Sequence, residues 1–445
     1  MIKTINNYWQ KLAPLTRNLC LFALFNIVLV NIVIMLTSPF NWKDTVIFHA
    51  AKFLLLQPGN NDSWLPMLNA FQYLESAHEK PLYAAIFFDN KTKFQYPPTS
   101  LLLIHLLKWI KLDEVSLNFI LNLISWIFLA VTVFLIIQIF NLSLEKNFGS
   151  EKEDFPNANV ITRNIILICL SITFYPVVKA YSLGQIQVWL NALFAIVFWC
   201  WMKNRVGWAG GLTGVMFLVK PQYLIIGLWG VICRKRFFAI AFSAIFLGGL
   251  AISIWLIGLA NHIDYLTVLS YISRHGEAFY PNQSVNGLLN RLFFNGNNIE
   301  WQGDSFAPFN MFVYVGTVVS SAILIGTSLL CEIKSKKRGN IFNLAIVSLS
   351  CTMASPIAWD HHYGILLPIY AFLLPYLIKH PIFGRMTFPF LGLAYVLSSN
   401  YLPIFNKLAS LPVLNIFQSY LFMAALMLLV CLYAFKVKKI SSISE

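Results

Sequence analysis

Hydrophobic residues along this chain are grouped into long uninterrupted runs. These runs occupy residues 18–37, 115–140, 237–259, 308–331 and 412–435. Each is long enough to cross a hydrocarbon core of about 30 Å as a helix. A segment in lipid must satisfy its backbone hydrogen bonds internally, which favours helices. The pattern therefore predicts an all-α polytopic membrane protein.

Composition supports a membrane protein. Of the 445 residues, 58% are hydrophobic and 11% are charged, whereas a typical soluble domain has about 25% charged residues. These values exclude a soluble enzyme, a disordered protein and a fibrous protein. The net charge of +14 comes from short basic clusters between the apolar runs, which is typical of topology signals. We expect membrane lipids and no nucleic acid as partners.

The seven cysteines lie in or beside apolar runs without CxxC spacing, which indicates packing residues.

Basic clusters near span ends prefer the cytoplasm, so they allow the chain to be threaded through the membrane. The threading predicts about twelve spans in a single domain, 1–445, with both termini inside. It leaves two large outer loops, 38–114 and 260–307. Two short apolar stretches, 206–219 and 222–233, meet at Lys220-Pro221 and could form a re-entrant pair.

Two segments of the first outer loop predict helices lying in the membrane interface. Residues 97–110 are apolar but too short to span, and Lys108 lies near their end. The segment after Asp62 has an apolar stripe at helical spacing. The stripe consists of Trp64, Met67, Leu68, Phe71 and Leu74.

The threading brings the unusual polar residues to the outer membrane boundary. They are Asp44, Asp62, Tyr96, Lys179, Gln185, Lys220, Gln222, Arg274, Asn282, Gln283, Arg291, Trp359, Asp360, His361 and His362. Each alone could be an ordinary loop residue. Because they converge on one side, we expect the two outer loops to roof a cavity there.

The acid and the cations suggest a division of roles. A carboxylate near a helix N-terminus stays ionised, so Asp62 could accept a proton from a sugar hydroxyl. The alternative is that Asp62 only caps the helix. Lys179, Lys220, Arg274 and Arg291 could surround a phosphate, although such side chains also extend to the interface without a ligand.

A metal or nucleotide cofactor has no visible anchor. His361 and His362 are poor co-ligands of one metal, because successive residues of a helix point about 100° apart, and no third His or Cys has ligand spacing. Walker, GxGxxG and GxSxG motifs are missing from the sequence. We expect neither a metal nor another cofactor.

Five motifs in order carry a family resemblance. They are FQYPPTSLLL, SLGQIQVWLNAL, LVKPQYLI, YPNQSVNGLLNRL and ASPIAWDHHYGILL. The chain resembles glycosyltransferase family 87 from about residue 62 to about residue 368. These membrane glycosyltransferases are related to polyprenyl-phosphate-mannose-dependent mannosyltransferases.

The resemblance implies a GT-C bundle whose first outer loop carries the catalytic acid. In the family this acid precedes a helix, a Leu-Tyr pair and Tyr-Pro-Pro, which Asp62, Leu82-Tyr83 and Tyr96-Pro97-Pro98 match. About 20 residues that include Asp44 separate the first span from Asp62, and the usual glycine before Leu-Tyr is replaced. Asp44 is therefore the alternative acid.

The expected function is transfer of a hexose such as mannose from a polyprenyl-phosphate donor to a lipid or glycan acceptor. The expected location is a bacterial inner membrane, with the site on its periplasmic or outer face, and the single displacement inverts the sugar. Asp62 is the expected base, assisted by His361 and His362. The expected phosphate ligands are Lys220, Arg291 and Lys179, and the expected substrate ligands are Tyr96, Gln185, Gln222, Asn282, Gln283, Trp359 and Asp360.

Two other functions suit a polytopic chain. A transporter or lipid flippase would place ionisable groups inside the spans and show hydropathy repeats, but the long spans here are nearly free of charge. A ligase or polymerase of lipid-linked glycans would also use outer arginines and histidines.

Overall fold

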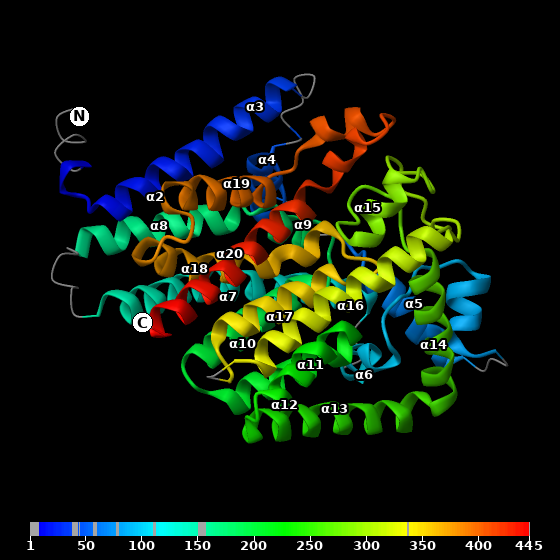
Figure 1. The fold of residues 1–445 in the computed structure, drawn as a ribbon. Coiled ribbons are helices and arrows are strands. Elements are labelled where there is room, and N and C mark those ends of the chain that lie inside the picture. Colours follow the sequence, from blue (N-terminus) through cyan, green and yellow to red (C-terminus); the bar gives the residue numbers. More distant parts are fainter. Residues whose placement is uncertain are drawn as a thin grey trace.

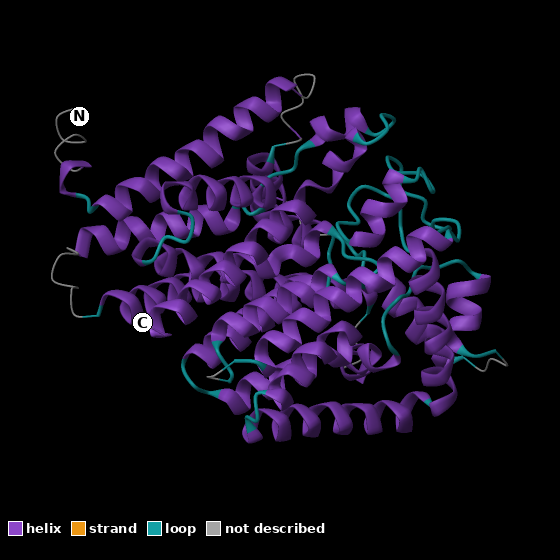
Figure 2. Cartoon of the chain, viewed as in Figure 1, coloured by secondary structure: helices purple, strands orange, loops and turns teal. Residues whose placement is uncertain are grey.

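All regular structure in the described part of the chain is helical (Figure 2). The computed structural model describes residues 9–37, 43, 45–56, 60–76, 80–109, 113–149, 157–335 and 338–444. Within these residues, extended backbone pairs at a single isolated antiparallel bridge between Asn282 and Trp359. The all-α prediction is thus confirmed for this part.

Six of the described helical segments are long and apolar enough to cross a membrane. They contain α2 (Pro14–Leu24) continued by η1 (Phe25–Leu29) and α3 (Val30–Thr37), α7 (Glu114–Phe148), α13 (Arg236–Ile257), α16 (Met311–Ile333), η8 (Asp360–Ile365) with α18 (Leu366–Lys379), and η11 (Leu414–Ser419) with α20 (Tyr420–Ser444). The pair α8 (Asn157–Ile172) and α9 (Tyr175–Ser182), bent by 53°, makes a seventh if it is one broken span. The protein is therefore a multi-pass membrane protein.

The remaining helices are shorter. They are α4 (Val46–Ala51), η3 (Lys52–Leu56), α5 (Trp64–Glu75), η4 (Ala84–Asp89), η5 (Pro98–Ser100), α6 (Leu101–Trp109), α10 (Gln187–Met202), α11 (Val206–Val219), η7 (Pro221–Tyr223), α12 (Leu224–Ile232), α14 (Leu259–His275), α15 (Val285–Leu292), α17 (Ile341–Met353), η9 (Gly384–Met386), α19 (Thr387–Ser399) and η10 (Pro403–Leu408). Because several expected spans fall in this shorter class, the number twelve stays a prediction.

Burial separates central helices from peripheral ones. Helices α10 and α17 are buried along almost their whole length, whereas few residues of α13 and α16 are buried. Trp255 of α13 is 81% exposed and Phe312 of α16 is 76% exposed. Exposed apolar surface of this extent suits contact with lipid and would be unfavourable in water.

The described part of the predicted first outer loop packs against protein. The stripe residues Trp64, Met67, Leu68 and Phe71 of α5 are buried in a second core with residues of α6 and α14. The helix predicted after Asp62 is therefore present, but its apolar face contacts neighbouring helices. An interfacial position of α6 stays a prediction.

The long helices run roughly side by side, and the short helices of the outer loops gather at one end (Figure 1). Helices α5, α14 and α15 lie at this end, while the start of α2 and the end of α20 lie at the other. The loops predicted to share one side thus share one end of the bundle.

Glycines allow α11 and α13 to pack unusually closely. A Cβ on Gly210 of α11 would lie 2.2 Å from the carbonyl oxygen of Phe238 in α13. One turn later, a Cβ on Gly214 would lie 3.0 Å from Cβ of Ile245. Small residues four apart let helix backbones approach each other in membranes.

We expect Gly210→Ala to destabilise the protein by about 1–3 kcal/mol, because the new methyl group overpacks the α11–α13 contact. Thermal unfolding in detergent, followed by tryptophan fluorescence, measures this as a lower midpoint. Gly248→Ala in α13 is the matched control, since nothing lies within 4 Å of its added Cβ. Equal midpoints for the two variants would show that the close contact does not stabilise the fold.

Candidate active site

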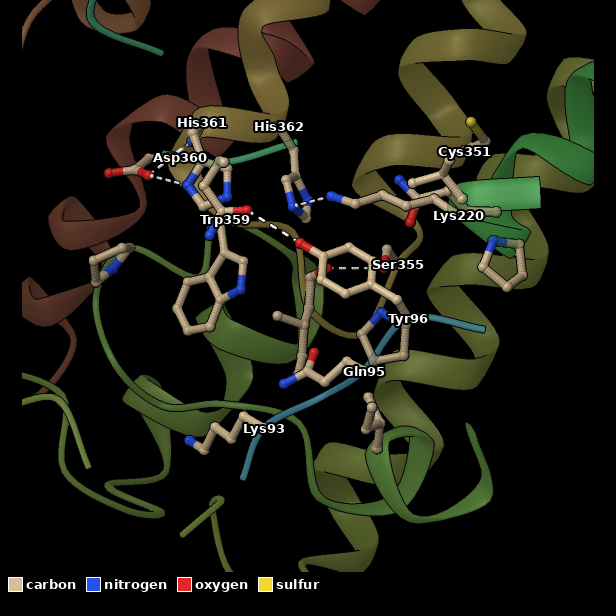
Figure 3. A pocket seen from close by; sticks show the side chains of 18 of the residues that line it. Lys93, Gln95, Tyr96, Lys220, Cys351, Ser355, Trp359, Asp360, His361 and His362 are labelled. Atoms are coloured by element: carbon tan, nitrogen blue, oxygen red, sulfur yellow. Dashed lines mark hydrogen bonds and ion pairs between the residues drawn. The ribbon is translucent and has the colours of Figure 1, made fainter. Parts of the chain in front are cut away.

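A cavity of about 690 Å³ opens where the short helices meet the ends of the long ones. Its polar lining contains Asp62, Lys93, Gln95, Tyr96, Tyr175, Lys179, Gln185, Lys220, Gln222, Tyr280, Trp301, Ser355, Trp359, Asp360, His361 and His362. Val219, Leu224, Ile225, Leu269, Ile272 and Ile325 provide apolar lining. Figure 3 shows Lys220 and His362 pointing toward each other, with Asp360 and His361 beside them.

Most of the sequence-predicted residues meet in this cavity. Those that line it are Asp62, Tyr96, Lys179, Gln185, Lys220, Gln222, Trp359, Asp360, His361 and His362. Arg274, Arg291, Asn282 and Gln283 are not among its lining residues. Asp44, the alternative acid, lies outside the described residues.

The carboxylate of Asp62 is positioned by a backbone contact between two distant segments. The amide of Asp62 donates to the carbonyl of Leu183 at 2.9 Å, and that of Asn60 donates to Ser182 at 3.0 Å. Gly184 makes the contact possible, because it has φ +65° and its added Cβ would lie 1.5 Å from the Asn60 oxygen. Glycine adopts this conformation without strain, and without a Cβ it leaves this space.

A polar network then orients the carboxylate. The side-chain amide of Gln185 donates to Asp62, while its oxygen accepts from the hydroxyls of Ser63 at 2.7 Å and Tyr96 at 3.2 Å. Ser63 also accepts from the Ile186 amide at 3.0 Å. These bonds determine which end of the Gln185 amide faces Asp62. Burial raises the pKa of Tyr96, so its hydroxyl keeps its proton and can donate.

The capping interpretation of Asp62 is not supported. Helix α5 begins at Trp64 after Ser63, and no side-chain hydrogen bond caps it. The carboxylate of Asp62 is exposed to the cavity, and it accepts a hydrogen bond from the side chain of Gln185. Its oxygens therefore have free accepting capacity for a ligand.

Lys220 is a buried cation with neutral partners. Its ammonium group lies 2.7 Å from the side-chain oxygen of Gln187 and 2.6 Å from Nε2 of His362. Lys220 lies at the break between helices α11 and η7. The helix ends there because Pro221 has no backbone N–H and cannot continue the hydrogen bonding of α11. In the described part of the chain, no carboxylate lies within ion-pair distance of Lys220.

A buried acid holds the neighbouring imidazole. Asp360 accepts from the hydroxyl of Tyr175 at 3.2 Å and from the backbone amide of His361 at 2.7 Å. Nδ1 of His361 lies 3.3 Å from the same carboxylate. Within the described residues, Nε2 of His361 and Nδ1 of His362 are buried without a hydrogen-bond partner. Such atoms are free to bond a ligand.

Arg291 supports backbone that lines the cavity, because it donates to the carbonyls of Phe279 and Tyr280. Its wholly buried guanidinium donates to the carbonyl of Asn282 at 3.0 Å and to Oγ of Ser419 at 2.7 Å. The side chain of Asn282 accepts from the Ala358 amide at 2.9 Å, and Gln283 donates to the Gln418 carbonyl at 2.8 Å. The structure thus places these residues, expected to bind substrate or phosphate, in the frame behind the cavity wall.

Sequence reasoning missed Lys93 and Trp301, which line the cavity, and Glu277, which pairs with Lys93 outside the lining. Lys93 forms an ion pair with Glu277 at 2.5 Å, and its ammonium lies 4.0 Å from the ring centre of Trp301. Burial raises the pKa of Glu277 to about 7, and Lys93 opposes this shift. The pair joins the two predicted outer loops, and its residues are more than 180 positions apart in the sequence. A local sequence pattern therefore cannot predict it.

The cavity can therefore hold an anion near Lys220 and accept a proton at Asp62. Groups of three or more His, Cys, Asp or Glu that could hold a metal were not found among the described residues.

Known proteins resemble this chain in sequence. The model of glycosyltransferase family 87 matches residues 94–356, more than half of the chain. The polyprenol-phosphate-mannose-dependent alpha-(1-2)-phosphatidylinositol pentamannoside mannosyltransferase of Mycobacterium tuberculosis (strain CDC 1551 / Oshkosh) is 27% identical over 209 residues. This stretch is 46% of the chain and 44% of the relative. The chain thus matches less than half of the relative's length.

We expect Gly184→Ala to lower the unfolding midpoint in detergent more than Gly384→Ala does. Both glycines have positive φ, at +65° and +54°, so each alanine costs about 1–2 kcal/mol of backbone strain. Only at position 184 does the new methyl group also meet backbone, since nothing lies within 4 Å at position 384. Similar losses in the two variants would argue against a tight contact beside Asp62.

Proposed function

The chain belongs to glycosyltransferase family 87, and from this premise we propose that it transfers a hexose such as mannose from a polyprenyl-phosphate donor to a lipid or glycan acceptor. One observation carries the proposal. A single cavity contains a carboxylate with free accepting capacity at Asp62 and a buried ammonium at Lys220 that has no carboxylate partner among the described residues. These are the groups that an acceptor hydroxyl and a donor phosphate require.

The donor phosphate binds near Lys220. A buried cation without a counter-ion is costly, and an anionic ligand removes this cost. Lys179 lines the same cavity, and the nitrogens Nε2 of His361 and Nδ1 of His362, which have no partner among the described residues, supply further contacts. The apolar wall at Leu224, Ile225 and Ile325 suits the first isoprenoid units of the lipid.

The reaction is a single displacement. Asp62 takes the proton of the acceptor hydroxyl as that oxygen bonds to the anomeric carbon. The bond from this carbon to the phosphate oxygen breaks, and polyprenyl phosphate leaves with the electron pair. Lys220 stabilises the growing negative charge on the phosphate. Attack opposite the leaving group inverts the configuration at the anomeric carbon. The hydrogen bond from Gln185 orients the Asp62 carboxylate.

The proposal needs no metal, because ammonium and imidazole groups contact the phosphate.

The proposal includes a location of the cavity at the outer face of a bacterial inner membrane, following the positive-inside rule. The twelve-span threading belongs to the same proposal. Short helices such as α10 and α17 would then cross the membrane surrounded by other helices.

We expect Asp62→Asn to lower kcat by about 10²–10⁴, the range for loss of a general base. The assay measures transfer from labelled polyprenyl-phosphate-mannose to a membrane extract in the presence of EDTA. Asp89→Asn is the matched control, because Asp89 lies in the same outer loop and forms an exposed ion pair with Lys80.

Asp44→Asn separates the two candidate acids. Loss of activity only in Asp44→Asn would retain the enzyme class and move the base to Asp44. If the native protein consumes no donor, the transporter or flippase function becomes the better explanation.

Lys220→Met is expected to reduce kcat/KM for the donor by about 10²–10³, as for loss of one group that stabilises a developing anion. Methionine keeps the apolar part of the side chain and removes the charge. Lys203→Met is the control, since Lys203 is exposed and outside the cavity lining. Unchanged donor kinetics in Lys220→Met would exclude Lys220 from the phosphate site.

A further inference from the structure

On the side of the cavity lined by Lys93 and Trp301, the charge of Lys93 is compensated by Glu277, which is not itself a lining residue. The side chains of Lys93 and Glu277 are only 10% and 6% exposed, and they neutralise each other at 2.5 Å. The Lys93 ammonium also donates to the carbonyl of Gln302 at 2.8 Å and lies 4.3 Å from the ring centre of Phe306. With its donors and charge in use, Lys93 has little left for an anionic ligand.

An aromatic wall stands beside this pair. The rings of Trp301 and Trp359 are 5.3 Å apart and nearly perpendicular, and Phe279 lies 5.6 Å from Trp301. Trp301 is 48% exposed and lines the cavity. In the view of Figure 3, the indole of Trp359 extends from the chain beside His361 toward the side where Lys93 lies.

The free polar groups here are neutral. Gln95 lines the cavity, and no hydrogen bond of its side-chain amide is found within the described residues, nor one of the Trp301 indole N–H. The cavity thus has one cationic region around Lys220 and one neutral aromatic region around Trp301.

A sugar ring matches the neutral region. Its C–H groups suit the negative face of an indole, and its hydroxyls can bond an amide and an indole N–H. An anionic headgroup would find no free cation beside Trp301, and an alkyl chain would cover polar groups without bonding them. A volume of about 690 Å³ also lies within the range of about 300–1,000 Å³ for small-molecule sites.

We propose that Trp301, Trp359 and Gln95 form the acceptor subsite and that it takes an uncharged sugar ring. The assignment rests on the proposed function, since it supplies the hydroxyl that Asp62 deprotonates. It divides the cavity between a phosphate region for the donor and an aromatic region for the acceptor. Lys93 and Glu277 hold the aromatic wall in place as positioning residues.

A binding experiment with two probes tests this division. The full chain is placed in phosphatidylcholine nanodiscs, because a maltoside detergent would itself offer a sugar. Radiolabelled octyl α-mannoside probes the aromatic region, and octyl phosphate probes the cationic region. We expect Trp301→Ala to weaken octyl mannoside binding at least tenfold and to leave octyl phosphate binding unchanged, whereas Lys220→Met does the reverse.

Two controls protect the interpretation. Trp208→Ala removes a tryptophan that is 71% exposed on α11 and outside the cavity lining, so it should leave both probes unaffected. Trp301→Phe keeps an aromatic face without the indole N–H and should bind octyl mannoside with intermediate affinity. Normal binding of octyl mannoside to Trp301→Ala would overturn the subsite, as would an equal loss of both probes.

The binding readout does not depend on turnover. If Lys220→Met leaves octyl phosphate binding intact, the proposed donor site fails while the Trp301 result still decides the acceptor subsite. In the transfer assay with octyl mannoside as acceptor, Trp301→Ala should raise the acceptor KM at least tenfold with the donor KM unchanged. A rise in the donor KM alone would contradict the assignment.

Discussion

The lipid around the helices is the constraint on which the rest of this structure depends. Backbone groups in hydrocarbon must be satisfied within helices, so polar side chains gather where helices end or break. The cavity follows this rule, because Asp62 precedes α5, Lys220 occupies the break after α11, and His361 and His362 lie in the short turn before α18. Helix ends from distant parts of the chain thereby converge in one polar space.

Two buried ammonium groups in this space have opposite surroundings. Lys93 has a carboxylate at 2.5 Å and aromatic faces around it, so its charge is compensated within the protein. Lys220 has the neutral side chains of Gln187 and His362. Because an uncompensated buried charge is unfavourable, Lys220 gains most from an anionic ligand. This contrast underlies the proposed separation of donor phosphate and acceptor sugar.

A rigid frame supports both regions. Arg291 ties the 278–282 backbone to Ser419, and Asn282 pairs with the segment that leads to the histidines. On the other side, Gly184 lets the chain before α5 lie directly on the end of α9. The catalytic groups proposed here are thus positioned by backbone contacts as much as by their own hydrogen bonds.

Hydropathy alone determined that the chain is an all-helical membrane protein, because helices that cross lipid need long apolar runs. The ordered motifs around Tyr96, Gln185 and Lys220 determined its family. Only the tertiary structure decided which polar residues share the cavity. It grouped Asp62 with Gln185, placed Arg291 and Asn282 in the frame, and revealed the pair of Lys93 and Glu277. The physical reason is that the sequence around a polar residue at a helix end is the same whether its side chain faces a ligand or a neighbouring carbonyl. Packing between distant segments decides which of the two it contacts.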